Sequence, residues 1–274
     1  MHRLLEMDST KVFLNIENHL RTFEIFHFIS DSYWSWAAKK LGTKRTNKLN
    51  EIREPLIDGA NSEQLDIFYD YVSHPILSSV IHSMKADAIK VSGIEVDSIL
   101  PQSGRILELG CSIGYLTTFY ALQSSDRFVI GCDSSKKTIL RAKKESQNRK
   151  IKNVEFELIN IIHGLPDGTF DAIVSTQVLS AISGSQLIFE RIVKALSPEG
   201  ILITIEALGT ELEANQFIMG LKRAGLNLVN FKFLYFCDLG EKGGYPLFIF
   251  SRHGNAIEID LKEEYKKALE IIKG

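Results

Sequence analysis

The sequence of 274 residues has few cysteines, little net charge and no long uncharged apolar run. Its three cysteines, Cys111, Cys132 and Cys237, lie far apart and form no C-x-x-C pair. This spacing argues against a zinc site and against a disulfide framework, so we expect no bound metal. Buried free thiols in a reducing compartment are the favoured interpretation. Cys111 and Cys132 could approach each other if their strands are neighbours.

The formal net charge of −2 lacks the basic excess that a general nucleic-acid binder usually carries, so no nucleic-acid partner is expected. No uncharged run approaches the ~20 residues needed to span a membrane. Charges interrupt the apolar residues at the N-terminus, which argues against a signal peptide. The sequence therefore predicts a soluble cytoplasmic protein that neither spans nor binds a membrane.

One basic run, from Lys136 to Lys152, could be a footprint for RNA. Ile139, Leu140 and Ala142 lie within it at the spacing of an amphipathic helix. A solvated helix face is therefore the favoured interpretation of this run.

The first hundred residues show helical spacing and no convincing strand pair. Asp8-Ser9-Thr10 could cap a first helix. A polar stretch over 42–55 is expected to link two helices, and 62–91 should form one or two more. Pro75 should break or begin one of them.

From about residue 103 to 208, short apolar runs alternate with helical stretches, which predicts right-handed crossovers and a parallel sheet. The runs are nearly continuous in Ile, Leu and Val, as expected for strands covered on both faces. The predicted strands cover 105–109, 128–133, 154–158, 170–175 and 201–206, and the predicted helices cover 114–123, 136–148 and 186–196.

The end of the chain has a different pattern. A helix over 211–224 should stop at Gly225, and two strand-like runs should follow over 226–236 and 245–252. The glycines between these runs suit a hairpin or a flexible loop. A final amphipathic helix is expected over 260–273.

The stretch "RILELGCSIGYL" places a glycine-containing turn between the first strand and the next helix. Ligands of parallel sheets bind at this carboxyl edge. Gly110 allows a close approach to the main chain, and Gly114 is placed to open the helix, whose free N–H groups favour electron-rich ligand groups. Asp133 ends the second strand, where its carboxylate can accept hydrogen bonds from both hydroxyls of a ribose. We therefore expect a ligand that contains a nucleoside.

The turn matches neither of two common phosphate-binding patterns. A pyrophosphate loop reads G-x-G-x-x-G, whereas Ser112 and Tyr115 stand where that pattern has glycines, and no G-K-[S/T] is present. Glu108 would place a negative charge near the pocket. That charge disfavours a pyrophosphate and favours a ligand with an ammonium and a sulfonium.

These residues resemble the motifs of the class I S-adenosylmethionine-dependent methyltransferases. "ILELGCSIGYL" resembles motif I, an acidic residue, any residue and then G-x-G-x-G, with Ser112 in place of the middle glycine. "VIGCDSS" resembles the second motif, with Asp133 at the ribose position. "FELINIIHGLPDGTFDAIV" resembles the third and fourth regions, with Asn160 where the family usually has an Asp that bonds the adenine amino group. "ALSPEGILITIE" resembles the stretch before the fifth strand, with Glu199 replacing a glycine.

The resemblance covers about residues 80 to 252 and implies an α/β fold with a Rossmann-like, mostly parallel sheet whose last strand is antiparallel. An N-terminal helical cap over 1–80 is expected to form a substrate or dimerisation region. The methyltransferase domain would cover 81–254, and a C-terminal helix would cover 255–274.

The resemblance also implies S-adenosylmethionine as the cofactor and S-adenosylhomocysteine as its product. The implied reaction is in-line methyl transfer to the oxygen or nitrogen of a small organic acceptor. The cofactor-binding residues that it implies are Glu108, Gly110, Cys111, Ser112, Gly114, Asp133, Ser134, Asn160, Ile161, Thr176 and Gln177. An RNA or protein methyltransferase, non-methyl chemistry on this fold and a non-catalytic S-adenosylmethionine-binding regulatory protein remain alternatives. Ser112 and Asn160 permit the last of these.

The acceptor side is less defined, and no catalytic base is assigned. His163 and His74 are the candidates for a base, with a surface-loop position as the alternative for His163. The aromatic residues that could contact the acceptor are Tyr33, Trp36, Tyr69, Tyr71 and Tyr245. Core packing is the alternative for the first four of them. The N-terminal helices could also form a homodimer interface.

Overall fold

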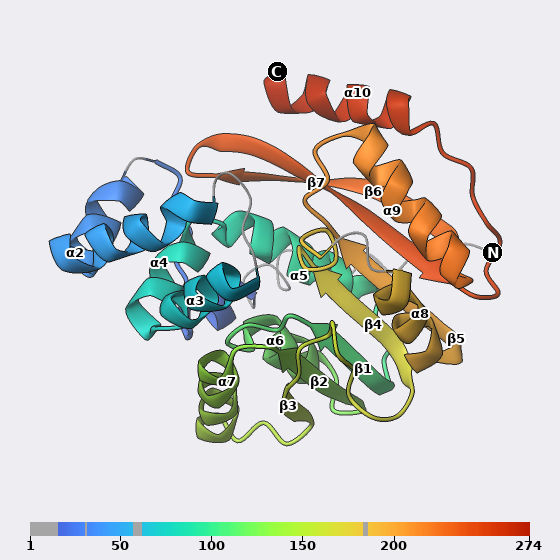
Figure 1. The fold of residues 1–274 in the computed structure, drawn as a ribbon, viewed down its shortest axis with the longest axis horizontal. Helices are drawn as coiled ribbons and strands as arrows, with labels where there is room; N and C mark the ends of the chain where they lie inside the picture. Colours follow the sequence, from blue (N-terminus) through green and yellow to red (C-terminus); the bar gives the residue numbers. More distant parts are fainter. Residues whose placement is uncertain (1–15, 31, 57–61, 183–185) are drawn as a thin grey trace.

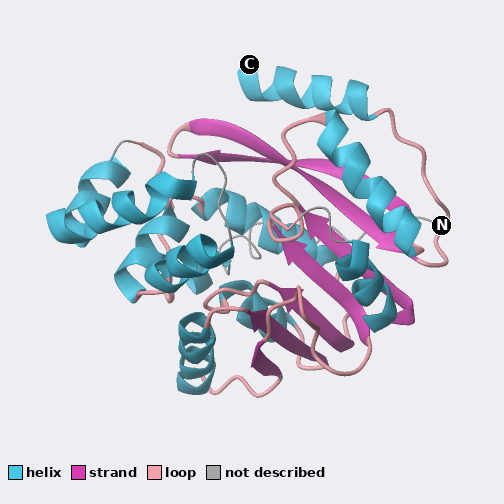
Figure 2. Cartoon of the chain, in the orientation of Figure 1, coloured by secondary structure: helices cyan, strands magenta, loops and turns pink. Residues whose placement is uncertain are grey.

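The computed structural model describes residues 16–30, 32–56, 62–182 and 186–274. The expected helix cap at Asp8–Thr10 lies outside the described residues. Figure 1 labels the elements and Figure 2 colours them by type.

A seven-stranded sheet in the order β3-β2-β1-β4-β5-β7-β6 forms the centre of the molecule (Figure 2). The strands are β1 (Gly104–Leu109), β2 (Arg127–Asp133), β3 (Val154–Leu158), β4 (Phe170–Thr176), β5 (Leu196–Ile205), β6 (Asn227–Asp238) and β7 (Glu241–Ser251). Strands β1 to β5 pair in parallel, whereas β7 runs antiparallel to both β5 and β6. The predicted Rossmann-like sheet with an antiparallel last strand is confirmed.

Helices cover both faces of the sheet, because successive strand residues point to opposite sides and both sets are apolar. Helices α5 and α6 bury their apolar faces against one set, which includes Ile106 and Val174. Helices α8, α9 and α10 pack against the other, which includes Leu107 and Ile173. The helices that follow the cap in sequence are α5 (Ala86–Ile99), α6 (Tyr115–Gln123), α7 (Lys136–Asn148), α8 (Gln186–Ala195), α9 (Glu211–Ala224) and α10 (Leu261–Lys273).

Most of the basic run from Lys136 forms the amphipathic helix α7, as the sequence predicts, but Leu140, expected on its apolar side, is 57% exposed. Ile139 and Ala142 are buried against Phe156 of β3. Lys143 and Lys144 lie on the exposed face.

The N-terminal helices form a separate group beside the sheet (Figure 1). They are α2 (Ser32–Arg53), the short 3-10 helix η1 (Glu54–Leu56), α3 (Ser62–Val72) and α4 (Pro75–Ser83). Pro75 begins α4, where its fixed φ and missing N–H are tolerated, and His74 is the N-cap residue. We call α2, α3 and α4 the cap.

The expected polar link over 42–55 is wrong. Residues 42 to 53 continue α2 after a kink at Gly42, whose φ is 66°. The polar side chains are compatible with a solvent-facing helix, and the non-helical backbone of Gly42 separates it from the helical segment before it.

The first described segment packs on the sheet core with its early residues and on the cap with Phe26 and Phe28. Ile16, Leu20, Phe23 and Ile25 are buried in the same cluster as the α6 side chains. The domain boundaries at 80 and 254 remain predictions, but the apolar core of the methyltransferase region includes residues that precede the cap.

The tip of the β6–β7 hairpin holds the start of α5. Asp238 accepts hydrogen bonds from the amides of Asp87 and Ala88, at 2.8 and 3.2 Å, and so caps the free N–H groups of that helix. Asp87 in return accepts a 2.8 Å bond from the amide of Cys237. The hairpin turns at Leu239 and Gly240, which have φ values of 55° and 86°. Both are positive, as in the tight turns that join adjacent strands, so of the two expected forms, a hairpin or a flexible loop, the structure has the hairpin.

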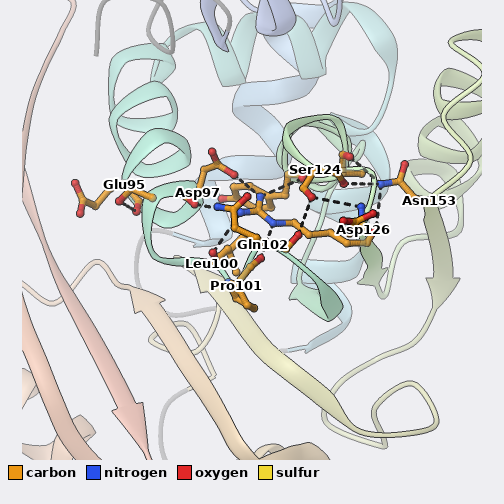
Figure 3. A network of polar contacts seen from close by, with 12 residues as sticks. Glu95, Asp97, Leu100, Pro101, Gln102, Ser124, Asp126 and Asn153 are labelled. Atoms are coloured by element: carbon orange, nitrogen blue, oxygen red, sulfur yellow. Dashed lines mark hydrogen bonds and ion pairs between the residues drawn. The ribbon is translucent and has the colours of Figure 1, made fainter. Parts of the chain in front are cut away.

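At the opposite end of the sheet, a buried arginine joins α5 to the start of β2. Arg127 forms an ion pair with Asp97 and donates to the carbonyls of Pro101, at 2.7 Å, and of Leu100, at 3.3 Å. Figure 3 shows Asp97, Leu100 and Pro101 around this network. A charge taken out of water is tolerated only when partners replace the lost hydration, and here backbone carbonyls and a carboxylate do so.

We expect Arg127→Met to lower the free energy of unfolding by about 3–5 kcal/mol, because it leaves Asp97 buried without its partner. Urea denaturation followed by circular dichroism measures this change. The control is Arg21→Met, whose exposed pair with Glu17 should contribute less than about 1 kcal/mol. Equally small decreases in the free energy of unfolding of the two variants would show that the Arg127 network does not stabilise the fold.

Candidate cofactor and acceptor site

The two glycines of the first turn are required by the backbone and by close neighbours. Gly110 has a φ of 65°, and a Cβ there would lie 2.4 Å from Val178 Cγ2. Gly114 has a φ of 79° and is the N-cap residue of α6, with a Cβ position 2.6 Å from the Phe156 ring. The prediction that Gly114 opens the helix is confirmed. A side chain at either position would displace the turn.

Ser112 takes the place of a glycine in this turn and adopts a left-handed φ of 51°. Its amide donates a 3.0 Å hydrogen bond to Asp133 Oδ2, and its hydroxyl lies 3.4 Å from His82 Nε2 of the cap. His82 Nδ1 lies 2.7 Å from the Ser78 carbonyl, so Nδ1 carries the proton and Nε2 can accept from Ser112. Burial lowers the pKa of His82 to about 4, so the imidazole is neutral at neutral pH. His82, a cap residue that no sequence pattern indicated, therefore accommodates the serine.

Asp133 joins the ends of β1 and β2. Besides the Ser112 amide, its carboxylate accepts from the Ser135 amide at 2.8 Å and from the Thr138 hydroxyl at 3.2 Å. Burial raises the pKa of this carboxyl, while these three donors lower it. Two carboxylate oxygens offer about four acceptor sites, so one remains for a ligand hydroxyl.

Glu108 lies beneath the turn and is buried, with the Thr117 hydroxyl donating to Oε2. Burial raises the pKa of Glu108 to about 8, and the nearby charge of Asp133 contributes to the increase. Glu108 is therefore mostly neutral at pH 7 without a ligand. A cationic group brought beside it would favour the ionised carboxylate.

A cleft of about 300 Å³ opens beside Asp133. Its lining comes from three elements: Ile67, Tyr69 and Asp70 of α3, Ser134 and Ser135 after β2, and Asn160 after β3. Ile67 and Tyr69 are 52% and 46% exposed, which leaves apolar surface that a planar base can cover. Asp70 forms an exposed 2.6 Å ion pair with Lys137 of α7 across this region.

Asn160 keeps capacity for a ligand. Its Oδ1 accepts a 3.0 Å bond from the Ile162 amide, which leaves one acceptor site on Oδ1 and the side-chain NH2 donors. Ile161 is buried and supports the loop from below.

The end of β4 carries further polar groups. Thr176 has a buried hydroxyl without a hydrogen-bond partner among the described residues. Gln177 has a left-handed φ of 57°, and its Oε1 accepts a 3.2 Å bond from Lys85. Burial raises the pKa of the Tyr245 phenol on β7, and the nearby side chain of Gln177 lowers it. We call Lys85, Gln177 and Tyr245 the acceptor wall.

Several candidates line neither the cleft nor the acceptor wall. His74 accepts from the Ile76 amide at 3.3 Å and caps α4, and His163 is exposed in the loop after β3. Tyr33 and Trp36 pack in the core of the cap, where the Tyr33 hydroxyl donates to the Val80 carbonyl. Tyr71 packs against the same core. The structure thus gives these aromatics the packing role that the sequence left open, whereas Tyr69 lines the cleft and Tyr245 the acceptor wall.

Cys111 and Cys132 are neighbours, as the strand order predicts. The Cys111 amide donates to the Cys132 carbonyl at 2.9 Å, and both thiols are free and buried. The Cys111 thiol lies beside Gly131, so a ligand in the turn would meet the main chain of Cys111. Among the described residues, no group of three or more His, Cys, Asp or Glu side chains could hold a metal ion. The same residues include no helix long and apolar enough to cross a bilayer.

Comparison with known proteins identifies the domain. Residues 101–226 match a family model described as a methyltransferase domain. These residues form a class I S-adenosylmethionine-dependent methyltransferase domain. Its cofactor is S-adenosylmethionine. The [4+2]-cyclase SpnF shares the fold, with a TM-score of 0.58, 18% identity and coverage of 72% of this chain and 98% of that one.

Two curated relatives match parts of the chain. Phosphoethanolamine N-methyltransferase 3 of Arabidopsis thaliana is 32% identical over 126 residues, which are 45% of this chain and 25% of the relative. Highly reducing polyketide synthase 2 of Gibberella zeae is 28% identical over 204 residues, which are 67% of this chain and 8% of the relative. The chain thus spans a quarter or less of the length of these relatives.

The residues of this methyltransferase domain fit the cofactor. The cleft suits an adenine, the remaining acceptor site of Asp133 suits a ribose hydroxyl, and Glu108 suits the ammonium of the amino-acid end. The buried hydroxyl of Thr176 gives the β4 end a hydrogen-bonding capacity that the described residues do not use.

We expect the affinity for S-adenosylhomocysteine to rise as the pH increases from 6.5 to 8.5, because the ligand ammonium favours the ionised form of Glu108, whose pKa is about 8. Binding at pH 7 should release a proton, which calorimetry in buffers of different ionisation enthalpy detects. Glu108→Gln should bind at least about tenfold more weakly and lose this proton release. Glu51→Gln, on the exposed side of α2, is the control. Unchanged proton release in Glu108→Gln would contradict this assignment.

Asp133→Ala should weaken S-adenosylhomocysteine binding by about 1.5–3 kcal/mol, as expected for lost hydrogen bonds to a charged group. The variant also loses the acceptor that fixes Ser112. Calorimetric titration provides the affinity, and Asp126→Ala, an exposed carboxylate just before the opposite end of β2, is the matched control. Wild-type affinity in Asp133→Ala would exclude Asp133 from the ribose site.

Proposed function

We propose that this chain transfers the methyl group of S-adenosylmethionine to the nitrogen or oxygen of a small organic acceptor. The observation that carries the proposal is the cleft beside Asp133, which cap helix α3 lines from one side and the strand ends from the other. The methyltransferase domain alone provides the strand ends. The cap adds the second wall, and a pocket between two walls suits a small ligand.

S-adenosylmethionine, when bound, supplies a methyl group activated by the sulfonium. Transfer is a displacement at carbon, so the protein's task is to orient the reactants and to exclude water. Asp133 and Asn160 would bind the nucleoside, and Glu108 would bind the ammonium. Gly110 lets the backbone approach the ligand. Thr176 stands at the end of β4, directly before Gln177 of the acceptor wall.

The acceptor wall brings together groups from three distant parts of the chain. Lys85 comes from the start of α5, Gln177 from the segment after β4, and Tyr245 from β7. Lys85 and Tyr245 provide hydrogen-bond donors. We therefore infer that the acceptor presents an oxygen to this wall and its nucleophilic atom to the methyl group.

The curated relatives favour an amine as the nucleophile. The plant relatives are named phosphoethanolamine N-methyltransferases, from Arabidopsis thaliana and Triticum aestivum. Their matched part is a minority of their length, so phosphoethanolamine is a first test acceptor for this chain and not its assigned substrate. A homodimer through the cap also stays a proposal, supported by the exposed Ile29 and Trp34.

Calorimetry with S-adenosylhomocysteine, and separately with NAD, tests the proposal first. We expect micromolar binding of S-adenosylhomocysteine, about −8 kcal/mol, and no binding of NAD. Purified protein is then incubated with S-adenosylmethionine and either phosphoethanolamine, ethanolamine or a panel of aromatic amino and hydroxy acids, and S-adenosylhomocysteine release is measured.

Each result has a distinct meaning. Release that depends on an acceptor supports methyl transfer, and mass spectrometry of the product distinguishes N- from O-methylation. Binding without release from any acceptor favours the non-catalytic alternative. Failure to bind S-adenosylhomocysteine would overturn the proposed function.

A further inference from the structure

A second buried carboxylate, outside the residues assigned so far, lies at the end of β5. Glu206 is 0% exposed. Its Oε1 accepts a 2.6 Å hydrogen bond from the Ser175 hydroxyl, and its Oε2 accepts a 3.0 Å bond from the Ser180 amide. The Ser175 hydroxyl in turn accepts from the Leu179 amide at 3.3 Å. The carboxylate thus holds both the end of β4 and the segment that follows it.

The segment held by Glu206 forms part of the site. Gln177 begins it in a left-handed conformation, with its amide bonded to the Ile205 carbonyl at 2.7 Å. Val178 lies directly over Gly110, where a Cβ would be 2.4 Å from Val178 Cγ2. Leu179 is buried in the core on the α8 and α9 side. We call residues 177–180 the post-β4 segment.

Glu206 is one of several contacts that fix the backbone of this segment. Positive φ at a non-glycine residue costs free energy and persists only where the surroundings enforce it. The Gln177 amide is held by the Ile205 carbonyl, and the residues after Gln177 are held by the Glu206 carboxylate, the Ser175 hydroxyl and the packing of Leu179. If this segment were displaced, Val178 would move away from Gly110. The same displacement would move Gln177 away from Lys85 and Tyr245.

We propose that Glu206 is a positioning residue of the cofactor site, which acts by holding the post-β4 segment against the glycine turn and the acceptor wall. Glu206 itself touches neither reactant. The proposal rests on the proposed function, because it assumes that S-adenosylmethionine binds at the turn.

The alternative is that Glu206 only stabilises the fold. Two measurements, the melting temperature and the ligand affinity, distinguish these two roles. A structural role lowers the melting temperature and leaves the ligand affinity of the folded protein unchanged. A positioning role changes the affinity for S-adenosylhomocysteine under conditions where every variant is fully folded.

The experiment compares Glu206→Leu, which has similar volume but no acceptors, with Glu206→Gln, which keeps one amide oxygen for the Ser180 amide. S-adenosylhomocysteine affinity is measured by calorimetry well below the melting temperature of each variant. We expect binding at least about tenfold weaker in Glu206→Leu and substantial rescue, to within about threefold of the wild type, in Glu206→Gln. Hydrogen exchange should accelerate in peptides that cover residues 176–182 of Glu206→Leu.

Two further variants complete the design. Thr204→Val, on the same strand, removes a buried hydroxyl without a partner among the described residues and should leave the affinity unchanged. Ser175→Ala removes one contact of Glu206 by a milder change and should weaken binding in the same direction, which keeps the test available if Glu206→Leu does not fold. Wild-type affinity in both Glu206→Leu and Ser175→Ala, or in Ser175→Ala if that variant alone folds, would overturn the proposal. Failure of the wild type to bind S-adenosylhomocysteine would instead overturn the proposed function.

Discussion

The hydrogen bonds accepted by Asp133 hold the site together. This carboxylate at the end of β2 bonds the Ser112 amide in the turn after β1 and the Ser135 amide at the start of α7. The bond to Asp133 stabilises the left-handed backbone conformation of Ser112, which normally favours glycine. The same serine meets His82, so the cap, the glycine turn and the ribose position are all fixed relative to one carboxylate.

The two ends of the sheet bury different ionisable groups. The carboxyl end has two buried carboxyl groups, Glu108 and Glu206, and the half-buried Asp133, and burial raises the pKa of each. The amino end has Arg127, enclosed by carbonyls and by Asp97. Buried carboxylates are costly unless donors or a cation compensate them. A ligand with an ammonium and a sulfonium provides that compensation, which agrees with the family's cofactor.

The cap is where sequence patterns were least informative. The polar residues over 42–55 looked like a link because they bury little, yet a helix whose surface is mostly solvated has the same composition. Tyr33 and Trp36 looked like pocket residues because they are aromatic, yet they contact the cap's own core. Tyr69 has the same chemistry and lines the cleft. Only its place on α3, facing Ser134 and Asn160, distinguishes it from the others.

The resemblance to a known family implied the cofactor, and the sequence by itself determined the parallel sheet, the glycine turn and the acidic residues at the strand ends. These features are local, since strand and helix periodicity and turn chemistry depend on neighbouring residues. Only the tertiary structure decided which distant side chains meet. His82 reaches Ser112 across 30 residues, Lys85 reaches Gln177 across 92, and Glu206 reaches Ser175 across 31. Such contacts depend on how helices and strands pack against one another. The spacing of residues within one segment does not predict them.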